Sequence, residues 1–267
     1  MIHYIGHPDL KFTEDKDDWA NMDQAVHYLS QCNVIAVDTE TEGMDFTCKK
    51  MIMLQIGNEA HQWVIDVRCT DITPLKNILE DEIIVKILQN VKFDYKFIKK
   101  CGIDLVNVYD TYLAERVLNC GRKDKKFSLD ALTKLYVEKD LDKSVRNQFV
   151  RLEGKPYTDK QIEYGAKDVE YLCEIRRGQA KEIRKHLLFN VVALESKAAL
   201  ALAEIEYNGL DLDRDKWLEI SVANENKATE YYNKLDNMVI NDPRLQSFVL
   251  KYIQGDLFTD QKELRKV

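Results

Sequence analysis

No stretch of the sequence is apolar over the roughly 20 residues that a membrane-spanning helix requires, and the N-terminus lacks the basic and then apolar segments of a signal peptide. The six cysteines are scattered without a Cys-x-x-Cys pair, which favours reduced thiols over a zinc cluster or a disulfide framework. The five histidines also lack the spacing of metal ligands. We therefore expect a soluble, cytoplasmic protein.

Acidic residues outnumber basic ones, 46 to 39. A formal net charge of −7 argues against a dedicated high-affinity nucleic-acid clamp, because such binding depends on neutralising phosphates. It does not exclude an enzyme whose metal ions meet a single phosphate, since the carboxylates of such a site would themselves lower the net charge. With 45% hydrophobic and 32% charged residues, the chain can bury a core while keeping a solvated surface.

The hydrophobic pattern predicts an α/β fold. A β-branched run at 34–39 is typical of a buried strand, and two runs at 51–57 and 61–67 have the spacing of a hairpin. These segments predict three consecutive antiparallel strands. From Pro74 onward the two kinds of element alternate, with strands expected at 83–89 and 105–110 and helices at 75–82, 92–102, 111–121, 129–137 and 158–186. This order predicts a mixed sheet flanked by helices.

The C-terminal part of the chain has a different character. Two further helices are predicted at 189–208 and 214–240, interrupted at Asn208-Gly209, and no closing element follows them. We therefore predict a complete domain over 1–188 and an incomplete, helical second domain over 189–267.

Acidic side chains of interest occur at three places. Asp38 and Glu40 end the first predicted strand, and residues two apart on a strand share a face. Paired carboxylates suit Mg²⁺ or Mn²⁺, although an acidic turn explains them equally well. Asp94 lies in a predicted helix, and Tyr164 and Asp168 lie one turn apart on a later helix. Taken singly, Asp94 and this last pair are typical of solvated helix surfaces.

The combination of these motifs is far more specific than any one of them. D-x-E after a strand, Q-N-x-K-F-D at the start of a helix and Y-x-x-x-D within a late helix occur in this order. From about residue 30 to residue 180 the chain resembles the DEDDy branch of the DnaQ-like 3′→5′ exonucleases. The resemblance implies a ribonuclease H-like fold and an enzyme that releases 5′-mononucleotides from a 3′ end. All five positions of the family's site are present, as Asp38, Glu40, Asp94, Tyr164 and Asp168.

The resemblance also implies roles for individual residues. Two divalent cations, Mg²⁺ or Mn²⁺, are held by four carboxylates, those of Asp38, Glu40, Asp94 and Asp168. Tyr164 orients the attacking water, because a phenol with an ordinary pKa near 10 is a weak base. Four residues are implied to contact the substrate: Thr39, Met44, Asn90 and Phe149. A core position under a loop explains Phe149 at least as well.

The flanking segments suggest which exonuclease this is. Gln89-Asn90 and the segment LESKAALALAEIEYNGLDLDRDKW (194–217) are similar to the proofreading domain of family A DNA polymerases and its entry into the polymerase domain. The leading hypothesis is therefore an enzyme acting on a single-stranded 3′ end of DNA, with a polymerase domain in cis or in trans, in a bacterial or phage-infected cell. KSVRNQF at 143–149 is similar to an RNase D-like pattern, so an RNA-trimming exonuclease is the alternative. A non-catalytic polymerase scaffold is a third possibility, disfavoured because every acidic ligand is intact.

Overall fold

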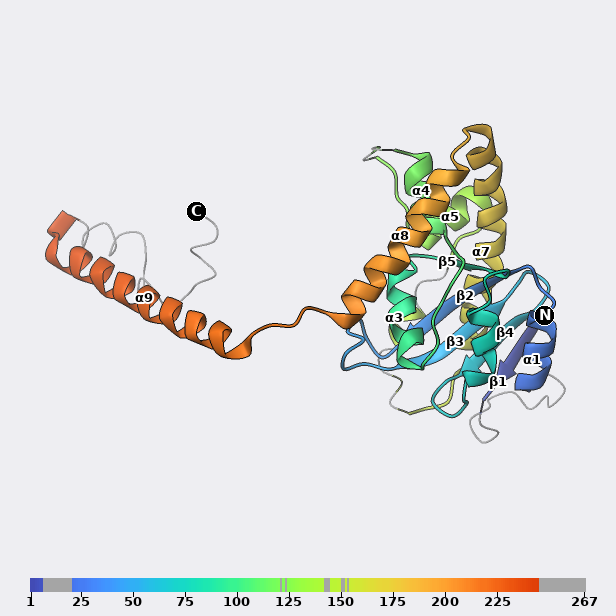
Figure 1. The fold of residues 1–267 in the computed structure, drawn as a ribbon, viewed down its shortest axis with the longest axis horizontal. Helices are drawn as coiled ribbons and strands as arrows, with labels where there is room; N and C mark the ends of the chain where they lie inside the picture. The colour runs from blue at the N-terminus through green and yellow to red at the C-terminus, as the bar shows by residue number, and fades with distance from the viewer. Residues whose placement is uncertain are drawn as a thin grey trace. The chain divides into compact units, whose positions relative to one another are not determined.

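The computed structural model describes residues 1–6, 21–120, 122, 124–141, 145–149, 152 and 154–244. The chain divides into two compact units, Met1–Gly209 and Leu210–Val267. The first unit holds a six-stranded sheet flanked by helices, which confirms the predicted α/β class (Figure 1). Within the described part of the chain, no helix is both long and apolar enough to cross a membrane.

The sheet is mixed, with the strand order β1-β4-β3-β2-β5-β6. The central strands β2, β3 and β4 pair antiparallel, as the sequence predicted, whereas β1 runs parallel to β4, β5 to β2, and β6 to β5. The strands span Ile2–Ile5 (β1), Val34–Thr41 (β2), Met51–Gly57 (β3), Gln62–Asp66 (β4), Val85–Leu88 (β5) and Val108–Asp110 (β6). Strand β1 was not predicted from the sequence.

Helices cover both faces of the sheet. On one face lie α1 (Met22–Leu29), the 3-10 turn η3 (Thr73–Leu75), α2 (Lys76–Leu79) and α3 (Lys92–Lys100), whose apolar side chains share a core with β2, β3 and β4. The other face is covered by α7 (Asp159–Lys185). The remaining helices of this unit are α4 (Thr111–Leu118), α5 (Leu129–Tyr136), α6 (Arg146–Phe149) and α8 (Phe189–Asn208).

Alternation along the central strands decides which side chains meet α7. Ile35 and Val37 of β2 enter the core with α1, α2 and α3, whereas Ala36 packs with Val169 and Leu172 of α7. Because successive side chains on a strand point to opposite faces, the even-numbered residues of β2 face α7. The carboxylates predicted at the end of β2 therefore point toward this helix.

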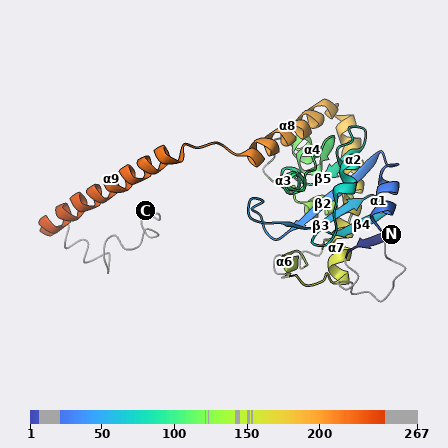
Figure 2. The same ribbon diagram turned by 60° about the horizontal axis from the view of Figure 1, so that its bottom comes forward.

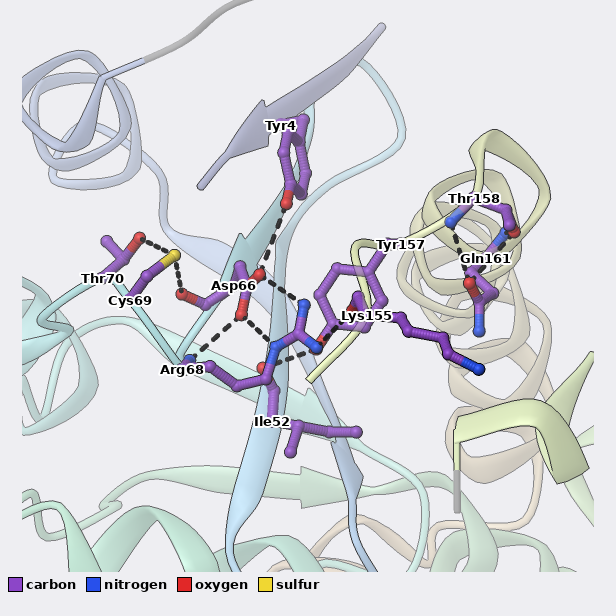
Figure 3. Close-up of polar contacts among 10 residues, drawn as sticks. All are labelled: Tyr4, Ile52, Asp66, Arg68, Cys69, Thr70, Lys155, Tyr157, Thr158 and Gln161. Atoms are coloured by element: carbon purple, nitrogen blue, oxygen red, sulfur yellow. Dashed lines mark hydrogen bonds and ion pairs between the residues drawn. The ribbon is translucent and has the colours of Figure 1, made fainter. Parts of the chain in front are cut away.

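A polar network centred on Asp66, at the end of β4, contacts the segment that precedes α7 (Figure 3). Asp66 is fully buried and accepts two hydrogen bonds from the Arg68 guanidinium, Nε to Oδ1 at 2.8 Å and Nη2 to Oδ2 at 2.7 Å. Arg68 also donates from Nη1 to the Lys155 carbonyl at 2.6 Å and lies over the ring of Tyr157. The Tyr157 hydroxyl donates to the carbonyl of Ile52 in β3 at 2.8 Å. The segment that leads into α7 is thus fixed to the sheet.

Helix α7 then begins with a capping box. Thr158 is the N-cap, its side chain accepts a hydrogen bond from the Gln161 backbone N–H, and the Gln161 side chain accepts one from the Thr158 backbone N–H. This reciprocal pair satisfies two backbone donors that a helix start otherwise leaves without partners. The sequence-predicted start of this helix at Thr158 is confirmed.

The first unit is one helix longer than the domain predicted over 1–188. Ala199 and Ala203 of α8 enter the main core, and Val192 packs with Ala114 of α4 and Ile183 of α7. The structural boundary therefore falls at Gly209, after α8. In the second unit, the predicted helix at 214–240 is present as α9 (Arg214–Asn241), which begins at the N-cap Asp213 and buries none of its described residues.

The buried Asp66–Arg68 pair generates a prediction about stability. Arg68→Met leaves a fully buried carboxylate without its cationic partner, a change that costs about 3–5 kcal/mol. Urea unfolding in EDTA measures this loss. The matched control is Arg177→Met, because Arg177 pairs with Glu59 on the exposed surface and such pairs contribute at most about 1 kcal/mol. Equal losses in the two variants would show that the network does not anchor α7.

Candidate active site

The candidate site is built where the end of β2 meets α7. Asp38 and Glu40 are half-buried on β2 and share the face that Ala36 presents to α7. Asp168, on α7, is 2% exposed. One carboxylate oxygen from each of these three residues lies within 4.8 Å of the other two. Residues far apart in the sequence thus form one compact acidic group.

Close contact between α7 and β3 makes this meeting possible. A Cβ atom at Gly165 would lie 2.7 Å from Nε2 and 2.9 Å from Cγ of Gln55, so a larger residue here would require the buried Gln55 side chain to move or α7 to lie further from β3. Gln55 is directly opposite Asp38 in the β2–β3 ladder and is fully buried. Because Gly165 and Asp168 are three residues apart, they lie on the same side of α7. The tight approach at Gly165 therefore carries Asp168 toward Asp38.

Asp94 approaches the same strand from α3. Thr39, which points to the opposite face of β2 from Asp38, donates a hydrogen bond from Oγ1 to Oδ1 of Asp94 at 2.6 Å. The Asp94 side chain is 3% exposed. Burial, and then the neighbouring charge of Asp38, raise the pKa of Asp94 well above its usual range. The expectation from sequence that Asp94 alone resembles a solvated helix residue is therefore wrong, since tertiary packing buries it.

Divalent cations fit this group of side chains. The atoms available as ligands are carboxylate oxygens. Mg²⁺ and Mn²⁺ prefer such oxygen ligands to the softer sulfur and nitrogen ligands that are typical of zinc and copper sites. Burial, and then the neighbouring charge of Asp38, disfavour the ionised form of Asp94, and Asp168 is buried as well. A bound cation offsets the repulsion between neighbouring carboxylates. The chemistry of the site thus accounts for both its composition and its charge.

Asp110 fixes the start of α3 and was missed in the sequence analysis. It is 1% exposed, caps α4, and accepts hydrogen bonds from the backbone N–H groups of Asn90 (3.0 Å) and Val91 (2.9 Å). Burial raises its pKa. These bonds hold Asn90 at a φ of +64°, in the left-handed region. An aspartate between a predicted strand and helix is a capping signal, but the sequence does not show that its carboxylate also reaches a second helix.

Tyr164 lies one turn before Asp168 on α7 and packs against Phe149 of α6, with 6.0 Å between the ring centroids. Figure 2 shows α6 beside the first turns of α7. Phe149 is 1% exposed and also contacts Tyr157. Its predicted role as a stacking surface for a base is therefore not supported, because its ring belongs to the core under Tyr164. The alternative that we considered, a core residue beneath a loop, matches the structure.

The other predicted substrate contacts differ in how accessible they are. Thr39 is buried and its hydroxyl is committed to Asp94, so its backbone is what remains to contact a substrate. Strand β5 pairs with β2 only over residues 34–36, so this pairing ends before Asp38 and Glu40. Asn90 is exposed at the start of α3, and Met44 is 77% exposed in the segment after β2. Met44 and Asn90 are thus accessible to a ligand, whereas Phe149 is not.

Comparison with known proteins identifies similar chains of two kinds. DNA polymerase I of Aquifex aeolicus is 26% identical over 90% of this chain and 45% of the polymerase. Human exosome complex component 10 is 31% identical over 55% of this chain and 16% of that protein. The chain therefore spans less than half the length of either relative. Among solved structures, Escherichia coli RNase D matches with a TM-score of 0.65 at 23% identity, over 84% of this chain and 55% of the RNase D chain.

The structural match confirms the ribonuclease H-like fold expected from the sequence. A family model described as 3′-5′ exonuclease matches residues 14–184, a range that contains every residue of the acidic group. Since this match covers more than half of the chain, the protein belongs to the DNA polymerase A 3′-5′ exonuclease family and is a metal-dependent 3′-5′ exonuclease.

Proposed function

We propose that this chain removes 5′-mononucleotides from single-stranded 3′ ends of DNA and is the proofreading part of a family A DNA polymerase. The observation that carries the proposal is the convergence of Asp38, Glu40 and Asp168, with Asp94 buried beside them. All members of the acidic set are intact, which argues against the alternative of a non-catalytic scaffold.

Two divalent cations, Mg²⁺ or Mn²⁺, are proposed to bind between these four carboxylates. When bound, they supply the Lewis acidity that activates a water and stabilises the leaving 3′ oxygen. The carboxylates position the ions, and Thr39 holds Asp94 in place through its 2.6 Å hydrogen bond. Tyr164 lies one helical turn from Asp168, which supports a role for its hydroxyl in orienting the attacking water. Packing of Tyr164 on Phe149 restricts the orientation of the tyrosine ring.

The preference for DNA is supported by the extent of the polymerase relationship. The Aquifex aeolicus DNA polymerase I match covers 90% of this chain, whereas the human exosome component covers only 55%. The exosome component and RNase D keep an RNA-trimming exonuclease as the second candidate. The bacterial polymerase relative favours the cytoplasm as the compartment, and the exosome relative leaves the compartment open.

A polymerase domain as partner, in cis or in trans, is supported by the outer side of α8. Exposed apolar residues follow one another at intervals of three and four, which places them in a single stripe along the helix: Val191, Leu194, Ala198, Leu202 and Ile205. Such a stripe on a helix favours a protein surface that covers it. We propose that the polymerase domain supplies this surface.

A nuclease assay tests both the enzyme and its substrate. The protein is incubated with 5′-labelled single-stranded DNA or RNA of the same sequence, in Mg²⁺, in Mn²⁺ or in EDTA. We expect shortening by one nucleotide at a time, faster on DNA and abolished by EDTA or Asp38→Asn. Glu174→Gln, at an exposed carboxylate of the same helix α7, is the control and retains activity. Faster shortening of RNA would overturn the proofreading role, and no metal-dependent shortening would overturn the enzyme itself.

Tyr164→Phe separates water positioning from metal binding. The phenylalanine keeps the ring contact with Phe149 but lacks the hydroxyl. We expect kcat on DNA to fall by roughly 10²-fold, the lower end of what a positioned proton-transfer group contributes, while Mn²⁺ still raises the melting temperature. Asp168→Asn is the comparison and loses both properties. An unchanged kcat in Tyr164→Phe would remove the hydroxyl from the mechanism.

Asp94→Asn is expected to stabilise the metal-free protein. The raised pKa of Asp94 means that the folded state is most stable below the ordinary aspartate pKa near 4 and loses stability as the pH rises. The asparagine keeps the acceptor for Thr39 and removes this loss, which amounts to about 1.4 kcal/mol per unit of pKa elevation.

Thermal unfolding at pH 8 measures the effect. In EDTA we expect a higher melting temperature for Asp94→Asn than for the unaltered chain. Addition of Mn²⁺ should then raise the melting temperature of Asp94→Asn by less than it raises that of the unaltered chain. Glu174→Gln should shift neither value. A less stable Asp94→Asn protein in EDTA would show that the Asp94 charge is not a destabilising feature of the empty site.

A further inference from the structure

A cavity of about 630 Å³ lies at the other end of α7 from the acidic group. Its walls come from the C-terminal half of α7, the first turns of α8 and the strands β5 and β6. The α7 residues that line it run from Arg176 to Arg184, which follow Asp168 by 8 and 16 residues, or about 12 and 24 Å along a helix. The cavity is thus separate from the candidate active site, and its volume lies within the range of about 300–1,000 Å³ that is typical of small-molecule sites.

Two buried polar atoms that line this cavity have no hydrogen-bond partner. The Ser196 side chain is 3% exposed, and its Oγ makes no hydrogen bond. The Nε of Arg176 is also buried without a hydrogen-bond partner. Within the described part of the chain, neither Arg176 nor Arg184 forms an ion pair. Because a buried polar group without a partner costs about 1–3 kcal/mol, this arrangement points to an acceptor that arrives with a ligand.

Two guanidinium groups and a hydroxyl are donors suited to a phosphate group. Arginine binds phosphate through paired N–H groups, and hydrogen bonds of this kind are roughly twice as strong as neutral ones. Arg176 lies over the ring of Tyr109, with 5.4 Å between the guanidinium carbon and the ring centroid, which limits where its donors can point. The Tyr109 hydroxyl is itself fixed by donation to Oε1 of Gln179 at 3.1 Å.

The rest of the cavity is apolar. Ile183, Val192 and Ala193 contribute to its walls, and Phe189, which is 72% exposed, stands at its edge. An inorganic anion would leave this apolar surface without contacts. A ligand with a planar ring beside its phosphate would use both parts of the cavity, because an exposed aromatic side chain can stack on any base.

We propose that this cavity binds a nucleoside monophosphate, with the phosphate at Arg176, Arg184 and Ser196 and the base against Phe189. The assignment comes from the cavity alone and does not depend on the proposed exonuclease activity. If that activity is also present, the cavity binds the same class of molecule that the active site releases. Product could then occupy a site remote from the acidic group.

Isothermal titration calorimetry of the full chain tests the proposal, with dAMP, deoxyadenosine and inorganic phosphate as separate probes. The titrations are made in EDTA, where the metal-free carboxylates of the active site repel a phosphate. We expect one site for dAMP, and binding of deoxyadenosine or phosphate that is weaker by about tenfold or more, the ratio expected for loss of charge-assisted hydrogen bonds.

Two variants locate the site. Arg184→Gln, at an exposed position of the cavity wall, should weaken dAMP binding by about tenfold or more. Lys185→Gln is its matched control, since Lys185 is the next residue, is exposed and pairs with Glu182 outside the cavity lining. Ala180→Trp fills the cavity without changing charge, and melting temperatures verify that each variant folds. If Ala180→Trp does not fold, the Arg184 and Lys185 pair still decides the question.

Three results would contradict the proposal. Absence of dAMP binding up to millimolar concentration overturns the site. Equal affinity in Arg184→Gln and Lys185→Gln overturns the assigned location, and deoxyadenosine binding as tight as dAMP overturns phosphate recognition.

Discussion

The contact between Gly165 of α7 and Gln55 of β3 is the constraint on which the candidate site depends. A side chain at residue 165 would collide with the buried side chain of Gln55, so either that side chain or the helix would have to move. Because Gln55 is opposite Asp38, this one contact sets the separation between the carboxylates of β2 and that of Asp168. The Asp66–Arg68 network and the Thr158 capping box then fix where along the sheet the helix begins. The geometry of the acidic group therefore depends on how closely α7 packs against the side chains of β3.

The same packing explains why the site favours a cation. Thr39 supports Asp94 from one face of β2, while Asp38 and Glu40 point from the other face toward α7. Folding thus crowds negative charges around one strand end, with Asp94 fully enclosed. The crowding reduces the stability of the metal-free protein. It also strengthens the binding of a divalent cation, because the cation relieves the repulsion between the carboxylates.

Much of this arrangement could be predicted from local sequence patterns, and the features that could not be predicted share one physical cause. Residue alternation placed Asp38 and Glu40 on one face, and helical spacing placed Tyr164 beside Asp168, because both rules act within a single element. The burial of Asp94 and Phe149 depends on contacts with Thr39 and Tyr164, 55 and 15 residues away, which periodicity does not report. Asp110 was missed for the same reason, since its bonds to Asn90 and Val91 join separate helices. Strand β1 has only four residues, too few for a clear pattern.

The family match ends at residue 184, yet the first compact unit continues through α8 to Gly209. A fragment cut where the match ends would uncover the core positions that Ala199 and Ala203 fill and would release Tyr95 from its 2.7 Å hydrogen bond to Glu204. Newly exposed apolar surface of this kind promotes self-association. For this protein, a shortened form that stays monomeric in solution must therefore keep α8, even though the family match ends before that helix begins.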